Sequence, residues 1–311
     1  MKRLVIALIF LVLVSGCDFG GNPGTLQSVT GGIDFSFYGL PDKLMNDMPF
    51  TINLDIFNYM TKKMDKNIKV CLGDVHPDEY SPISGEECTT VSMEAASVIE
   101  NQNGQLETLP EEKRISFPIN GGEYAFRNLD FGPATFFVTV GYPVDTTLSR
   151  NIYLLYPSFS SDEDEKKSKE TGSYQDFVIK EKTPITIDYF EKEVRPLSAG
   201  RARLKLVLHL TQAPEGVVYA SVNQREGDLD NLYMDIDVKG YDLNFNCGTD
   251  VGKDGKIKLV RGTKRLECYS DVNLKETDPH QVNLNINLKY YYKVKHSVTI
   301  PFETAGVGFS G

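Results

Sequence analysis

The residues best placed for covalent chemistry in this sequence of 311 amino acids are its five cysteines. Cys17 stands alone at the end of an apolar run, and the other four follow as two near pairs: Cys71 with Cys88, and Cys247 with Cys268. An even set of four thiols forms two disulfides in an oxidising compartment, whereas intracellular thiols stay reduced. The chemistry therefore depends on whether the chain is exported.

The first residues of the chain have the composition of an export signal. Lys2 and Arg3 precede an unbroken apolar run from Leu4 to Val14. Eleven residues rise only about 16 Å as a helix, which is too short for a hydrocarbon core of roughly 30 Å. We therefore interpret the run as a secretory signal rather than a transmembrane anchor.

The sequence Val14-Ser15-Gly16-Cys17 resembles the lipobox of prokaryotic lipoproteins. The resemblance implies that residues 1–16 are a signal peptide, that the chain is cut before Cys17, and that its thiol carries lipid. The membrane would then be a partner through this lipid. The protein would lie outside the cytoplasm, on the outer face of the cytoplasmic membrane or in the cell envelope. The alternative is an ordinary signal followed by an unrelated cysteine.

The four remaining cysteines predict two disulfides. Three pairings are possible, and we expect the one between sequence neighbours, Cys71–Cys88 and Cys247–Cys268. Loops of this size stabilise a fold by roughly 3 kcal/mol each on the chain-entropy model. A metal site is the alternative, but the sequence has no Cys-x-x-Cys pair.

Two acidic segments offer oxygen ligands for a cation. Residues 76–79 (His-Pro-Asp-Glu) lie between Cys71 and Cys88 with Glu86 and Glu87. Residues 228–231 (Asp-Leu-Asp-Asn) begin like a calcium loop, but Tyr233 occupies the position of the turn glycine. Solvated loops explain both segments, so we predict no metal site.

Three consecutive tyrosines, Tyr290, Tyr291 and Tyr292, could form a stacking surface for sugars. On a strand only Tyr290 and Tyr292 share a face. They continue the apolar alternation of Val282 to Leu288. We therefore expect them in the core.

The sequence contains none of the motifs that mark common active sites. There is no Gly-x-Ser-x-Gly, no His-Glu-x-x-His and no glycine-rich phosphate loop. The four histidines, His76, His209, His280 and His296, are scattered. We predict no catalytic residue, no cofactor and no enzymatic activity.

The composition of the chain indicates which classes of partner are disfavoured and whether it can form a core. The formal net charge is −10, which disfavours nucleic acid. A hydrophobic content of 41% is enough for a folded core.

Apolar residues alternate with polar ones through most of the chain, which predicts antiparallel strands. The expected strands cover residues 33–37, 50–56, 68–72, 88–93, 114–118, 123–128, 135–142, 151–156, 177–181, 184–189, 202–210, 217–222, 232–238, 243–247, 256–260, 265–269, 282–288 and 298–302. Asp254-Gly255 predicts a hairpin turn, and Met93–Glu100 a short helix. The fold class is all-β.

The charged segment 158–173 interrupts this alternation and predicts a linker. We therefore divide the chain into a flexible tether (17–30), a first immunoglobulin-like β-sandwich (31–157), the linker, a second sandwich (174–303) and a flexible tail (304–311). The alternative is a long loop within one large sandwich.

Residues 49–58 and 68–73 (PFTINLDIFN and IKVCLG) resemble the opening hairpin of CARDB-like domains, which are immunoglobulin-like sandwiches of prokaryotic cell surfaces. Residues 184–187 and 203–208 are similar in the second half. Met60 replaces the usual turn glycine. The resemblance implies a surface lipoprotein.

These observations predict a non-catalytic envelope lipoprotein that presents two modules to a surface or envelope protein partner. The alternative is a solute- or glycan-binding lipoprotein that serves a transporter. A pocket lined by aromatic residues would favour the alternative, whereas filled sandwiches with exposed sheet edges would favour the first.

Overall fold

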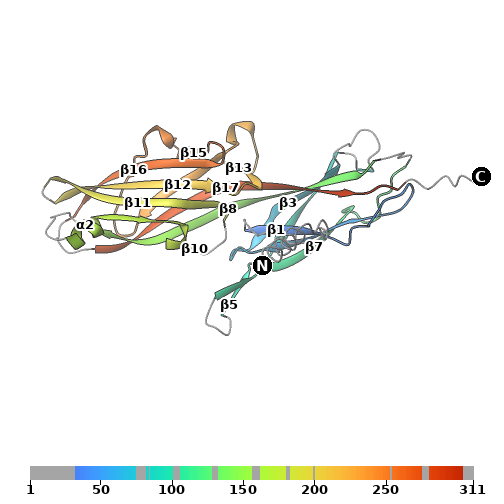
Figure 1. Ribbon diagram of the computed structural model, residues 1–311, viewed down its shortest axis with the longest axis horizontal. Coiled ribbons are helices and arrows are strands. Elements are labelled where there is room, and N and C mark those ends of the chain that lie inside the picture. Colours follow the sequence, from blue (N-terminus) through green and yellow to red (C-terminus); the bar gives the residue numbers. More distant parts are fainter. Residues whose placement is uncertain are drawn as a thin grey trace, which may run out of the picture.

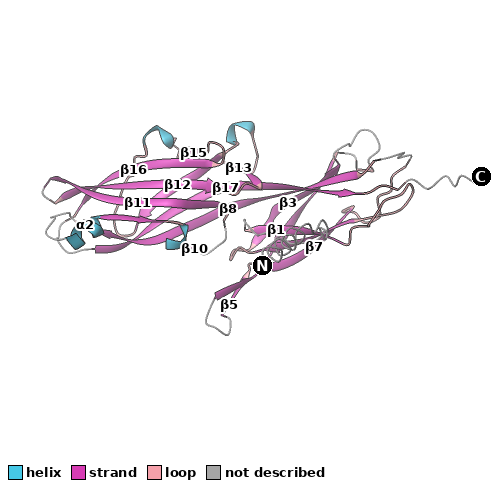
Figure 2. Ribbon diagram, in the orientation of Figure 1, coloured by secondary structure: helices cyan, strands magenta, loops and turns pink. Residues whose placement is uncertain are grey.

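Antiparallel strands form most of the computed structural model, as Figure 2 shows. The molecule is elongated, with its longest axis along two central strands (Figure 1). The predicted all-β class is therefore confirmed, and the arrangement is sandwich-like. The structure describes residues 32–74, 82–83, 85–100, 106–127, 132–155, 162–179, 183–198, 200–252, 254–274 and 280–303.

The first half of the chain contributes eight strands. They are β1 (Ile33–Tyr38), β2 (Ile52–Asn58), β3 (Met64–Asp74), β4 (Glu86–Met93), β5 (Ser97–Glu100), β6 (Leu106–Leu109), β7 (Glu111–Phe117) and β8 (Ala134–Leu154).

The second half contributes a short helix and nine strands. They are α2 (Asp162–Ser168), β9 (Lys169–Gly172), β10 (Val178–Ile179), β11 (Ile185–Ser198), β12 (Arg201–Gln212), β13 (Gly216–Tyr219), β14 (Asn231–Val238), β15 (Lys256–Lys258), β16 (Thr263–Asn273) and β17 (His280–Ile300). Three 3₁₀ turns lie between them: η1 (Tyr174–Asp176), η2 (Glu226–Asp228) and η3 (Gly248–Asp250).

Strands β8 and β17 join the two halves of the molecule. They pair antiparallel over 21 residues each, from Ala134 opposite Ile300 to Leu154 opposite His280. The sheet around them has the order β15-β14-β17-β8-β3-β4, with β10 also on β8 and β13 also on β17. One sheet therefore runs the length of the molecule, and we call it the shared sheet.

Each end of the shared sheet is covered by a second layer. The three-stranded sheet β1-β2-β7 covers the end formed by residues 134–141 of β8 and 293–300 of β17, together with β3 and β4. The four-stranded sheet β16-β12-β11-β9 covers the end formed by residues 145–154 and 280–289. We call these parts the N-terminal lobe and the C-terminal lobe.

Apolar side chains fill the space between the layers. Phe50 lies 5.7 Å from the rings of both Phe126 and Phe136 in the N-terminal lobe. Where the lobes meet, Tyr142 and Tyr292 face each other on β8 and β17 with ring centroids 5.8 Å apart. Burial of these rings and of the many Ile, Leu and Val side chains of the core is the main force that holds the layers together.

Strands β8 and β17 are longer than expected, because each covers a region in which the sequence predicts two short strands. Pro143 lies inside β8. A proline removes a ladder hydrogen bond, which favours a strand end. Here it falls between Gly141, the last residue of β8 that pairs with β3, and Leu148, the first that pairs with β10. Locally β8 therefore has a neighbouring strand on one side only, which accommodates the proline.

Two other expectations differ from the structure. The helix predicted at Met93–Glu100 is wrong, because β4 ends at Met93 and β5 begins at Ser97. The charged segment 158–173 contains α2 and β9, and β9 pairs with β11. Because the shared sheet contains strands from both halves, two independent immunoglobulin-like domains are not confirmed.

The turn prediction at Asp254-Gly255 agrees with the structure. Val251 bridges Ile257, and the Gly252 amide donates to the Lys256 carbonyl at 2.8 Å. Gly255 has a φ of 79°, a conformation that glycine adopts without steric cost.

Candidate functional site

Both disulfides join the expected cysteines. Cys71 and Cys88 lie directly opposite each other on β3 and β4 and are bonded. Cys247 is bonded to Cys268 of β16. Two disulfides are compatible with an extracytoplasmic location. Cys17 lies outside the described residues.

The first acidic segment forms no ligand set in the part of the chain that is described. Residues 76–79 lie outside it. Cys71, Glu86 and Cys88 have the spacing of metal ligands, but both sulfurs are used in the disulfide, so no thiolate is offered. Glu87 accepts hydrogen bonds from the Ile119 amide (2.6 Å) and the Tyr124 hydroxyl.

The second acidic segment is engaged by protein groups. Asp228 accepts hydrogen bonds from Lys256 Nζ at 2.8 Å and Ser221 Oγ at 2.7 Å. The Lys256 hydrogen bond is the main cause that lowers the Asp228 pKa. These contacts hold η2 against the hairpin that contains β15.

Two of the histidines pack against aromatic rings, and two of the three consecutive tyrosines lie in the core. His209 packs against the Tyr189 ring (5.5 Å) and His296 against the Phe35 ring (5.0 Å). His280 begins β17, and its side chain lies outside the described residues. Tyr290 and Tyr292 are only 4% and 3% exposed, so the prediction that they belong to the core is confirmed.

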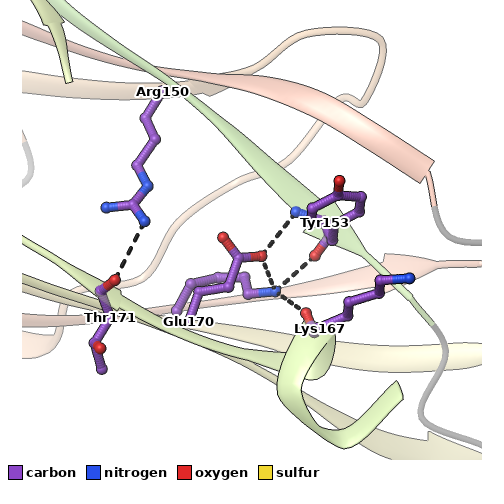
Figure 3. Close-up of polar contacts among 6 residues, drawn as sticks. Arg150, Tyr153, Lys167, Glu170 and Thr171 are labelled. Carbon is purple, nitrogen blue, oxygen red and sulfur yellow. Dashed lines mark hydrogen bonds and ion pairs between the residues drawn. The ribbon is translucent and has the colours of Figure 1, made fainter. Parts of the chain in front are cut away.

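A buried lysine fastens the charged segment to the C-terminal lobe (Figure 3). Lys192 of β11 is fully buried and donates to the carbonyls of Tyr153 (2.7 Å) and Lys167 (2.5 Å) and to Glu170 Oε1 (2.7 Å). Desolvation lowers the Lys192 pKa, and Glu170 opposes that effect. Every donor of the ammonium is engaged, so this lysine has a structural role.

Arg150 adds a second attachment of the same segment. Its Nη2 donates to the Thr171 carbonyl at 3.2 Å (Figure 3). Its guanidinium also lies 4.8 Å from the centre of the Phe190 ring. A Cβ at Gly172 would lie 1.8 Å from Arg150 Nη1, so a larger residue there would displace the end of the Arg150 side chain.

A depression with a volume of about 910 Å³ lies at the edge of β16. One side is the extended segment 241–247, which we call the edge segment. The six side chains of interest are Asp242, Asn244 and Asn246 of the edge segment and Arg203, Tyr269 and Asp271 of β12 and β16. We call this depression the polar groove. Sequence reasoning missed it, although residues 243–247 were expected to be extended.

Ion pairs set the electrostatics beside the groove. Arg203 Nε donates to Asp271 at 2.8 Å, and this bond is the main cause that lowers the Asp271 pKa. Lys205 lies 2.9 Å from Glu267 and lowers its pKa. Tyr269 donates to the same carboxylate, which raises the tyrosine pKa. The carboxylates therefore stay ionised at neutral pH.

An apolar hairpin is the second surface feature. Strands β5 and β6 pair only with each other and extend away from both layers of the N-terminal lobe, as the label β5 marks in Figure 1. Val98, Ile99 and Leu109 are 50%, 42% and 44% exposed. Sequence reasoning missed the hairpin, because Met93–Glu100 was expected to be helical.

Comparison with protein-family models gives no match to the chain, and comparison with curated proteins gives none either. Within the described residues, the helices are all too short or too polar to cross a membrane.

Proposed function

We propose that this chain is a non-catalytic lipoprotein of the cell envelope that binds another protein through its N-terminal lobe. The observation that carries the proposal is the β5–β6 hairpin. A two-stranded hairpin is marginally stable by itself. Exposed apolar side chains on such an element favour a protein interface.

The rest of the described N-terminal lobe supports the same function. Strand β4 ends the shared sheet and β7 ends the three-stranded sheet, so each has a neighbour on one side only. Edges of this kind accept a further strand from a partner. The hairpin connects these two strands in the chain, which places the apolar residues and both edges in one region.

The lipid anchor is part of the proposal and rests on the sequence Val14 to Cys17. We expect Cys17→Ser to abolish acyl labelling and leave the signal uncut by the lipoprotein peptidase. Detergent partitioning of the variant separates the outcomes, because partitioning like that of the unchanged chain would refute the anchor.

Photo-crosslinking in intact cells tests the interface. A photoreactive residue at Val98 should give a discrete adduct that Ile99→Ser reduces. The matched control is a photoreactive residue at Val178, which is equally apolar and 67% exposed but lies on β10, paired with β8 in the C-terminal lobe. Equal adducts from both positions, or none from Val98, would contradict the proposal.

A further inference from the structure

The polar groove has a built geometry that the protein-interaction function does not use. The Asn246 amide donates to the Tyr269 carbonyl at 2.8 Å, and the Tyr269 amide donates to the Asn246 carbonyl at 2.9 Å. Residues opposite each other in an antiparallel pair carry their side chains on the same face. Asn246 and Tyr269 are therefore neighbours on one surface. Asn244 and Asp271 line the same groove.

The edge segment owes this position to its sequence. Its exposed polar residues Asp242, Asn244 and Asn246 alternate with partly buried Leu243 and Phe245, which pack against the core. The disulfide from the adjoining cysteine to β16 then fixes the segment at the sheet edge. The polar side chains are thus held on one side, as a binding wall requires.

Several groups in the groove remain available to a ligand. Among the described residues, the Asp242 carboxylate and the Asn244 amide have no hydrogen-bond partner. The Tyr269 ring is 37% exposed. A carboxylate accepts hydrogen bonds, an amide both donates and accepts, and an aromatic ring packs against an apolar surface. Together they match the hydroxyl groups and C–H faces of a sugar.

A peptide that adds as a strand does not fit this edge. Such a peptide binds through backbone hydrogen bonds to a free sheet edge. At Tyr269 both backbone groups on that edge are already bonded to Asn246. A ligand beside Tyr269 must therefore use side-chain contacts.

Charge further limits the ligand. Arg203 is the cation among the groove residues, and it is paired with Asp271. Two further carboxylates of the groove are paired as well, Glu267 with Lys205 and Asp250 with Lys264. Among the described carboxylates that line the groove, Asp242 has no ion-pair partner, so its charge disfavours an anionic ligand such as a phosphate or a uronic acid.

We infer that the polar groove binds an oligosaccharide that is neutral or carries amino groups. A volume of about 910 Å³ lies within the usual range of ligand sites. This inference does not depend on the hairpin interface, since the two surfaces lie in different lobes.

Isothermal titration of the full mature chain with defined tetrasaccharides tests the inference. The probes are cellotetraose, the glucosamine tetramer and, as the anionic comparison, the galacturonate tetramer. We expect saturable binding of one or both of the first two and none of the third. Absence of binding by the first two, or preference for galacturonate, would overturn the inference.

Two tyrosines provide a matched pair of variants. Tyr269 and Tyr189 are 37% and 36% exposed, and each donates to a glutamate two residues along its own strand. Tyr269→Ala should weaken binding about tenfold, because it removes the stacking ring. Tyr189→Ala lies outside the groove and should leave affinity unchanged. Equal losses in both variants would overturn the inference.

A further variant guards against an indirect effect on folding. Asn244→Ala removes an exposed amide that has no hydrogen bond to another described residue, so the fold should persist while affinity falls several-fold. Unchanged affinity in a folded Asn244→Ala chain would argue against the groove. Binding of tetralysine at this site in place of both sugars would identify a cationic peptide as the ligand and also overturn the inference.

Discussion

The two lobes share a sheet and a two-layer design but differ in how their sheet edges end. In the N-terminal lobe, β4 and β7 are terminal strands and the connection between them extends into an apolar hairpin. In the C-terminal lobe, the edge segment covers β16 and β9 covers β11. The same architecture thus offers an apolar surface at one end and a polar groove at the other.

The two disulfides also differ in what they join at the sheet edges of the two lobes. Cys71–Cys88 joins two strands that are already paired, whereas Cys247–Cys268 joins an irregular segment to a strand. The first strengthens an existing sheet edge. The second creates the wall of the groove. A comparison of the lobes can therefore separate stability from binding.

The largest expected effect concerns whether the lobes are separable. Trypsin should cut at exposed Lys166 in the charged segment. We expect the two fragments to elute together in native buffer and to separate only in denaturant, because β17 stays paired with β8 along its length. Size-exclusion chromatography measures this. Separate folded fragments of residues 31–157 and 174–303 would instead support two independent domains.

The next effect compares two lysines of the C-terminal lobe: Lys192, which is fully buried, and Lys205, which is partly buried. Lys192→Met should lower the free energy of unfolding by about 3–5 kcal/mol, because Glu170 loses its buried partner. Lys205→Met removes a more exposed ion pair with Glu267 and should cost less than about 1 kcal/mol. Urea denaturation provides both values. Similar losses of unfolding free energy in the two variants would show that burial does not make the Lys192 ion pair more important for stability.

The two disulfides should have similar effects on stability and different effects on binding. The pairs close sequence separations of 17 and 21 residues. Replacing either pair with alanine should therefore cost roughly 3 kcal/mol. Only loss of Cys247–Cys268 should also weaken oligosaccharide binding, as titration at a temperature where both variants are folded would show. Weaker binding in both variants would indicate a general loss of order.

The smallest effect concerns acid. Because Arg203 lowers the Asp271 pKa, the stabilisation that this carboxylate contributes is present at neutral pH and is lost as pH falls through the lowered pKa. We expect the melting temperature to fall below about pH 4, and Asp271→Asn to reduce that fall slightly. Arg195→Gln, which alters a neighbouring exposed pair with Glu193, provides the comparison. A steeper fall of the melting temperature in Asp271→Asn than in the unchanged chain would contradict this prediction.

Local sequence patterns predict most strands because one face of each strand is buried. Ile52, Leu54 and Ile56 alternate with polar residues, and all three are fully buried on β2. The same alternation correctly assigns Tyr290 and Tyr292 to the core. Near spacing also predicts both disulfides.

Long-range pairing limits what the sequence reveals. Pro143 suggests a strand end, and only the position of β3 and β10 on β8 shows why the strand continues. The polar groove depends on the pairing of Asn246 with Tyr269, residues 23 positions apart whose partnership no local pattern specifies. The charged segment has few apolar residues, so its attachment through buried Lys192 leaves no periodic signal.

The pairing of β8 with β17 also determines when the N-terminal lobe can complete its folding. Residues 293–300 are synthesised long after residues 134–141, yet they complete the sheet of the N-terminal lobe. The first half of the chain therefore cannot close its own sandwich while it is being made. Pairing across such a sequence distance is slow, so the sheet of the N-terminal lobe should reach its final form late in folding.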